Sequence, residues 1–132
     1  MPYRHPDPES LIEKPVFGKG ECVDLIKATV PGLIGISTRS WREGENVLAS
    51  KTIKRGTAIA TFINGKFPHA DTGQHAAIFL SKSGSTIWVI EQWRGLKQVQ
   101  KRRISFPVHA ERRADGSYPN ASNNAFAFSV IE

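Results

Sequence analysis

Apolar residues in the first part of the chain recur at helical spacing. Residues 21–29 follow a Gly-Lys-Gly break at 18–20 and precede Pro31-Gly32, which cannot continue a helix. Within this segment, one helical face would carry Cys22, Leu25, Ile26 and Thr29. We therefore expect a helix over 21–29 whose apolar face packs inward and whose first turn holds Cys22.

A second, shorter helix is expected over residues 38–44. Thr38 can cap its start and Gly44 its end. Trp41 would then lie on this helix, either in the core or at the wall of a cleft, where it is a candidate for contact with a substrate.

Beyond Gly56 the pattern changes to short apolar runs separated by turns. The turn signals are Asn-Gly, Ser-Gly and Asp-Gly pairs at 64–65, 83–84 and 115–116. The runs cover residues 57–63, 75–80, 86–93, 99–106 and 125–131. A helix followed by such strands predicts an α+β fold, with the helix packed on one face of an antiparallel sheet of about five to six strands.

The 132 residues are enough for one domain with one core, and 39% of them are hydrophobic. Residues 1–17 hold four prolines and little periodicity, so we expect an irregular arm laid over that domain. The N-terminus lacks the apolar stretch of a signal peptide, and no segment reaches transmembrane length. We expect synthesis in the cytoplasm without a cleaved leader.

Positive charge is concentrated in residues 94–113. This segment holds seven of the 18 basic residues and one of the 12 acids, so eleven of each sign remain elsewhere. Such a segment either attracts an anionic partner or forms a solvated pair of strands. Arg102 and Arg103 are the candidate anion-binding residues, and His109 lies in the same segment.

Cys22 is the chain's only cysteine, which excludes an intrachain disulfide and metal sites built on cysteine pairs. At the start of a helix, unpaired amides and the macrodipole favour a thiolate. The flanking Gly18 and Gly20 would let a carbonyl approach the backbone, and an amide there could bind an oxyanion. A buried cysteine acting as a small hydrophobe is the alternative.

Two further residues could complete a catalytic set with Cys22. His75 opens a strand directly after a turn-prone segment, a position from which an imidazole can meet a thiol. Glu91 ends the next strand, and antiparallel pairing across the turn at 81–85 brings it near His75. If the register differs by one residue, Gln92 would take the place of Glu91.

A metal site built from His69, Asp71 and His75 is an alternative use of this histidine. No second cluster of ligands supports it in the sequence. We therefore expect no metal and no organic cofactor.

The order of four motifs resembles the CHAP and NlpC-type peptidoglycan amidases. The motifs are Gly-Glu-Cys-Val-Asp-Leu-Ile-Lys (20–27), Gly-Thr-Ala-Ile-Ala-Thr-Phe (56–62), His-Ala-Ala-Ile-Phe-Leu (75–80) and Val-Ile-Glu-Gln-Trp (89–93). The resemblance implies a minimal papain-like fold in which Cys22 is the nucleophile, His75 the base and Glu91 the third residue. Two departures are Glu21, where CHAP enzymes carry Gln, and the Gln92-Trp93 pair, where they carry Asn after the acid.

The resemblance is greatest to the small amidase effectors that bacteria deliver into competitors by type VI secretion. It implies hydrolysis of an amide bond in peptidoglycan stem peptides or cross-links, and action in the periplasm of a target bacterium. An immunity protein and a secretion carrier are the implied protein partners. The candidate substrate-binding residues are Trp41, Trp93, Arg102 and Arg103.

Two other functions remain open on the sequence. A non-enzymatic module could bind nucleic acid or another anion through the basic segment, but Phe106 is that segment's only aromatic residue, so we expect no nucleic-acid partner. A papain-like acyltransferase or deamidase acting on protein would use the same Cys22 and His75.

Overall fold

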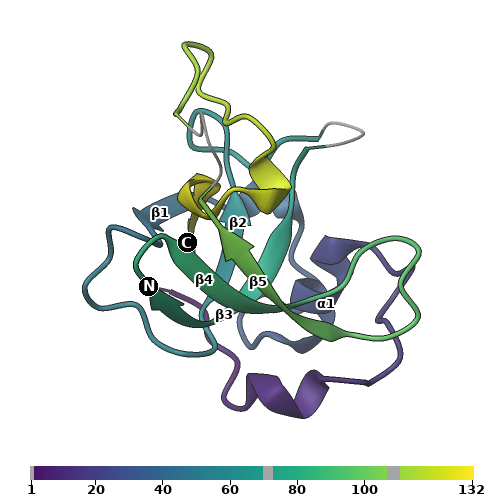
Figure 1. The fold of residues 1–132 in the computed structure, drawn as a ribbon. Coiled ribbons are helices and arrows are strands. Elements are labelled where there is room, and N and C mark those ends of the chain that lie inside the picture. The colour runs from purple at the N-terminus through teal and green to yellow at the C-terminus, as the bar shows by residue number, and fades with distance from the viewer. Residues whose placement is uncertain (1, 70–72, 107–110) are drawn as a thin grey trace.

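The computed structural model describes residues 2–69, 73–106 and 111–132. Its six strands form one antiparallel sheet with the order β1-β6-β2-β3-β4-β5 (Figure 1). The elements are η1 (Pro8–Leu11), α1 (Cys22–Thr29), η2 (Thr38–Ser40), β1 (Glu43–Asn46), β2 (Ala58–Thr61), β3 (Ala76–Ser83), β4 (Thr86–Glu91), β5 (Gln100–Ser105), η3 (Ala121–Asn123), η4 (Ala125–Ala127) and β6 (Phe128–Ile131); each η is a 3-10 helix. The predicted α+β class and sheet size are confirmed.

Helix α1 begins at Cys22 because the preceding turn is fastened to its first residues. The carboxylate of Asp24 accepts hydrogen bonds from the amides of Lys19 (2.9 Å) and Glu21 (3.3 Å). Gly18, at φ +58°, leaves room for Asp24, since a Cβ there would lie 2.8 Å from the Asp24 carboxyl carbon. Gly18 thus accommodates a capping side chain of its own chain, which is a different role from the substrate approach expected for it.

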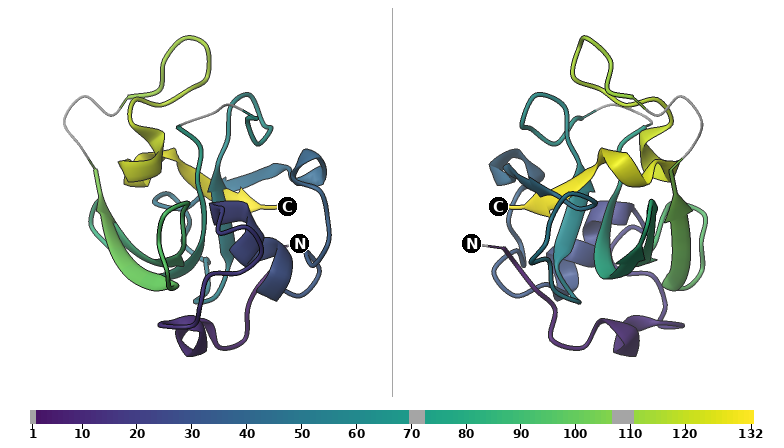
Figure 2. Two further views of the ribbon diagram at one scale, coloured as in Figure 1. Left: turned by 90° about the vertical axis from the view of Figure 1, so that its right-hand side faces the viewer. Right: turned by 60° about the vertical axis from the view of Figure 1, so that its left-hand side comes forward.

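The sheet is covered on both faces. Helix α1 packs on one face, where Leu25 and Ile26 are fully buried in a cluster with side chains of β2 and β3. On the other face, Val47 and Ala125 of η4 pack in a second cluster with Ile59 and Phe79. Figure 2 shows α1 beside the sheet. Strand β2, buried at all four positions, therefore lies in the middle of the molecule.

The N-terminal segment is bound to the sheet at two places. Near its start, the amide of His5 donates to the carbonyl of Gly56 (2.8 Å), and the amide of Ala58 donates to the carbonyl of Tyr3 (2.9 Å). Further on, Glu13 and Val99 are joined by a backbone hydrogen bond of 2.9 Å. Figures 1 and 2 show this purple segment passing beneath the sheet in each view.

The helix expected over 38–44 is wrong beyond its first turn. A 3-10 turn ends at Ser40, and residues from Glu43 onward form β1 instead. Backbone hydrogen bonds between Arg42 and Glu132, 2.7 and 2.8 Å long, start the pairing of this segment with β6. Pairing with a strand distant in sequence has overridden the local helical signal.

The register of β3 and β4 brings the end of β4 to the start of β3. Ile78 pairs with Ile90, and a bulge near Leu80 absorbs one residue before the turn. Continuing this register places Glu91 diagonally from His75 on one face of the sheet. The antiparallel pairing expected from the sequence is confirmed.

The contact between the N-terminal segment and Gly56 predicts a destabilising substitution. Gly56 has φ +94°, and a Cβ there would lie 2.1 Å from the backbone oxygen of His5. Gly56→Ala should lower the free energy of unfolding by about 1–3 kcal/mol. Gly84→Ala is the matched control, since Gly84 also has positive φ but no neighbour within 4 Å. Urea denaturation of both variants would measure the difference, and equal losses would contradict this packing account.

Candidate active site

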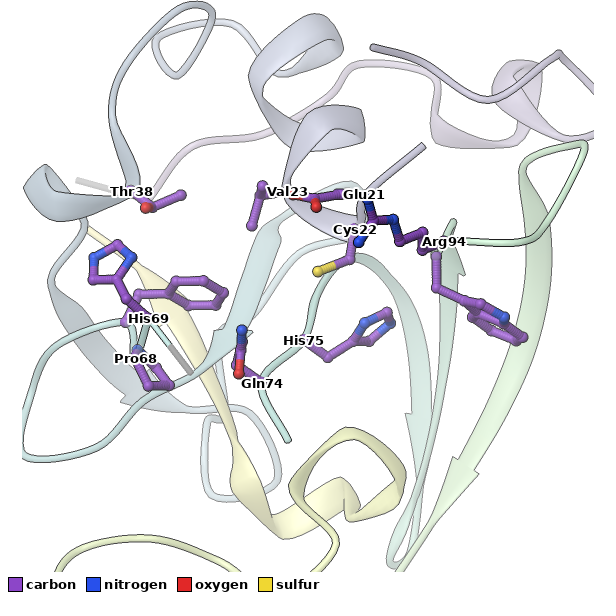
Figure 3. Close-up of a pocket in the computed structure, with 11 residues that line it drawn as sticks. Glu21, Cys22, Val23, Thr38, Pro68, His69, Gln74, His75 and Arg94 are labelled. Atoms are coloured by element: carbon purple, nitrogen blue, oxygen red, sulfur yellow. The ribbon is translucent and has the colours of Figure 1, made fainter. Parts of the chain in front are cut away.

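Cys22 faces a groove of about 530 Å³ at the N-terminal end of α1. In Figure 3 its sulfur points from the start of the helix into this groove, with Gln74 and His75 on the opposite wall. Arg94 lies toward one end of the groove, and Thr38, Pro68 and His69 lie toward the other (Figure 3). The sequence predicts that the helix face carrying Cys22 packs inward. In the structure Cys22 is only partly buried, so a ligand in the groove can reach it.

His75 lies at the edge where β3 begins and is held from several sides. Its amide donates to the Thr61 hydroxyl (3.0 Å), and the Thr61 amide donates to the His75 carbonyl (2.9 Å). The ring makes edge contacts with Phe128 and Trp93 and is 4% exposed. One ring nitrogen, Nε2, lies 2.7 Å from Glu91 Oε1, so Nδ1 is the ring nitrogen that Glu91 leaves available for Cys22, which lines the same groove.

Glu91 is a fully buried carboxylate whose two oxygens have different partners. Oε1 contacts His75, while Oε2 accepts hydrogen bonds from Arg102 Nε (2.5 Å) and Gln100 Nε2 (3.1 Å). A buried carboxylate is stable only when charges and hydrogen bonds replace its lost hydration. The structure therefore brings together the three residues proposed from the sequence, in the order Cys22, His75, Glu91.

The protonation of this set follows from its contacts. Burial lowers the pKa of His75, but hydrogen bonds with Cys22 and Glu91, together with their negative charge, outweigh it and raise the pKa to about 9. Burial raises the pKa of Glu91, whereas the hydrogen bonds and positive charges of His75 and Arg102 hold it below its ordinary value. At neutral pH His75 is thus an imidazolium paired with the Glu91 carboxylate.

Gln92 does not take the place of Glu91. Strand alternation sends it to the opposite face of β4, where it bonds the backbone of Phe17 and Glu21. The register expected for Glu91 therefore holds in the structure, and Gln92 contacts the segment before Cys22 rather than the imidazole.

The four expected substrate-binding residues have different placements. Trp93 lines the groove and is 37% exposed. Trp41 is 1% exposed, packed edge-on against Phe67, so it is a core residue that no substrate can reach. Arg102 bonds Glu91, and its other nitrogens donate to η3. Arg103 is exposed on β5 and does not line the groove.

Several groove residues escaped the sequence analysis. In the sequence, Arg94 is one charge of the basic segment, and Gln74 is part of a turn-prone stretch. Neither has a motif of its own, although adjacency to Trp93 and to His75 is a signal that could have singled them out. The remaining unpredicted lining residues are Val23, Thr38, Phe67 and Pro68.

The alternative metal site is not supported by the contacts of His75. Its Nε2 atom is engaged by Glu91, and Asp71 lies outside the described residues, as does His109. Within the described part of the chain, no group of three or more His, Cys, Asp or Glu side chains is arranged to hold a metal ion.

Comparison with known proteins assigns the chain to a family. The family model described as domesticated amidase effector 2 matches residues 4–119. The chain belongs to this amidase effector family. The type VI secretion amidase effector 2 protein of Salmonella typhi is 36% identical over the full length of both chains. The domesticated amidase effector 2 of Ixodes scapularis is 37% identical over 103 residues, which cover 76% of this chain and 70% of that one.

A solved structure extends the similarity to the fold. Type 6 secretion amidase effector 2 (Tae2) superimposes with a TM-score of 0.89 and 36% identity, covering 98% of this chain and 94% of that one. The expected papain-like α+β fold is thereby confirmed, as is the resemblance to type VI amidase effectors. The relation to CHAP and NlpC enzymes stays a prediction.

The raised pKa of His75 predicts a pH-dependent contribution to stability. Since its pKa rises from 6.5 to about 9 on folding, the contribution is complete below pH 6.5 and is lost as pH rises through about 9. The free energy of unfolding should fall across this interval, and less steeply in Glu91→Gln. NMR titration of the imidazole nitrogens would locate the proton. Glu45→Gln, at an exposed carboxylate, is the control; an imidazole that loses its proton near pH 6.5 would contradict the coupling.

Proposed function

We propose that this chain is a cysteine amidase that hydrolyses an amide bond in the stem peptides or cross-links of peptidoglycan. The observation that carries the proposal is that Cys22 and His75 line one open groove, while Glu91 contacts the His75 imidazole from behind. A nucleophile, a base and a group that orients the base are the parts that acyl transfer requires. Membership of an amidase effector family supports the same reaction type.

The first half of the reaction forms a thioester. The Cys22 thiolate attacks the carbonyl carbon, and the electron pair of the C=O bond moves to oxygen. The amide at the first position of α1 has no acceptor within the helix, so Cys22 N–H can bind this oxyanion. When the C–N bond breaks, the His75 imidazolium gives its proton to the leaving amine.

The second half regenerates the enzyme. Water attacks the thioester carbonyl while neutral His75 takes its proton, and cleavage of the C–S bond releases a carboxylic acid and the thiolate. Glu91 keeps the imidazole oriented in both halves and stabilises its positive form through the 2.7 Å contact with Nε2. Arg102 holds the other carboxylate oxygen, so Glu91 cannot turn away from the ring.

The names of the relatives support a proposal for where this enzyme acts. The type VI secretion amidase effectors that resemble this chain are 36% identical to it. We therefore propose that the protein is delivered into a competing bacterium. Its substrate there would be the peptidoglycan of the periplasm, and the producing cell would hold a cognate immunity protein. No helix among the described residues is long and apolar enough to cross a bilayer.

Digestion of isolated peptidoglycan tests the reaction. The unsubstituted protein should release soluble fragments, and Cys22→Ala should reduce the rate by about 10⁴-fold or more, because the nucleophile is lost. His75→Ala should have a similar effect, whereas His69→Ala, at the other histidine of the groove, should retain activity. Chromatography with mass spectrometry would identify the bond cut. An intact wall, with transfer or deamidation of a protein glutamine instead, would overturn the peptidoglycan proposal.

Arg94 should bind a carboxylate of the substrate, because it is the exposed cation of the groove wall beside Cys22. Arg94→Gln should raise KM for soluble wall peptides by about three- to fivefold, the effect of losing roughly 1 kcal/mol from an exposed ion pair. Arg103→Gln removes the same charge from outside the groove and should leave KM unchanged. Equal effects of the two variants would indicate that the overall positive charge, rather than a groove contact, governs binding.

A further inference from the structure

Two adjacent side chains at the end of β4 serve opposite faces of the sheet. Glu91 holds the imidazole of His75 on one face. Gln92, also fully buried, makes three hydrogen bonds on the other. Its Oε1 accepts from the amide of Phe17 (2.8 Å), and its Nε2 donates to the carbonyls of Phe17 (3.0 Å) and Glu21 (2.7 Å).

These bonds hold both ends of the turn that leads into α1. Phe17 begins the turn, whose closure is the hydrogen bond from the Gly20 amide to the Phe17 carbonyl (3.0 Å). Glu21 ends it, directly before Cys22 in the chain. The Glu21 carbonyl also accepts the first bond of the helix, from Asp24 (3.0 Å), so Gln92 reaches the peptide group next to the nucleophile.

We propose that Gln92 is a positioning residue that fixes the start of α1, and with it the Cys22 thiol, against His75. This inference rests on the proposed function, since it concerns the same thiol and imidazole. The last residue of β4 and the residue directly after it thereby act on the two halves of the site: Glu91 orients the base, and Gln92 places the nucleophile. No side chain needs to pass through the sheet.

The chemistry of an amide suits this position. Phe17 presents both a donor and an acceptor, and a carboxamide is the uncharged side chain that can pair with both at once. A carboxylate would lack the N–H donors for the two carbonyls, and an apolar side chain would leave buried backbone groups without partners. The hydrogen bonds of Gln92 fix how far the start of α1, and therefore Cys22, lies from β4. A misplacement of about 1 Å in a catalytic group costs on the order of 10²-fold in rate.

Gln92→Met tests the proposal, because it keeps the length of the side chain and removes all three hydrogen bonds. Asn46→Leu is the matched control. Asn46 also makes three side-chain hydrogen bonds to backbone, with Phe126, Phe128 and Ala49, but it lies on β1, away from the groove. The two readouts are the rate of Cys22 alkylation by iodoacetamide across pH, and kcat and KM on a soluble wall peptide.

The expected result is specific to Gln92. Gln92→Met should lower kcat by on the order of 10²-fold with KM changed less than about threefold, and should slow alkylation of the folded protein at neutral pH. Asn46→Leu should lose stability without either change. The inference would be overturned if Gln92→Met and Asn46→Leu had the same alkylation rate and the same kcat and KM. Slow alkylation of the unsubstituted protein would instead count against the proposed function, which separates the two failures.

A second variant and a measurement on the unsubstituted protein cover the case in which Gln92→Met does not fold. Gln92→Asn keeps an uncharged amide but is one methylene too short to reach both Phe17 and Glu21, so it should show the same loss of kcat in milder form. In the unsubstituted protein the Phe17 amide should exchange its hydrogen slowly. Rapid exchange at Phe17 would overturn the inference without any variant.

Discussion

The buried carboxylate of Glu91 is the constraint on which the site depends. Full burial of a charge requires that other groups replace water, and here His75, Arg102 and Gln100 do so. These partners come from β3 or its edge and from β5, the two neighbours of β4 in the sheet. Arg102 is in turn held by Ser122 and Asn123 of η3. A single ionised group therefore ties the C-terminal part of the chain to the imidazole.

The basic residues of segment 94–113 have different structural roles. Its charge density suggests a docking surface, yet Arg102 is a support for Glu91 and stacks over the ring of Trp93, which itself touches His75. Among the described residues of this segment, 94–106 and 111–113, Arg94 is the one that lines the groove. An arginine that is bonded on three sides has few donors left for a substrate, so the same stretch of sequence divides between internal support and external binding.

The site lies where regular structure ends. Cys22 is the first residue of α1, His75 precedes β3, and Glu91 closes β4. At such ends backbone groups lack partners within their own element, and side chains supply them: Asp24 for the turn before α1, Thr61 for the backbone of His75. Helix and sheet are thereby joined around the groove, which Cys22 lines from α1 and His75 lines from the edge of β3.

The sequence by itself determined the α+β class, the extent of α1, most strands, and the set Cys22, His75 and Glu91, because periodicity, turn residues and strand alternation are local properties of the chain. Only the tertiary structure decided the rest. Residues 43–46 became a strand because β6 pairs with them, and Trp41 became a core residue because it packs edge-on against Phe67, which is distant in sequence. The roles of Gln92 and Arg102 depend on groups about 75 and 11 residues away. No local pattern carries such contacts, since they exist only once the sheet has brought those segments together.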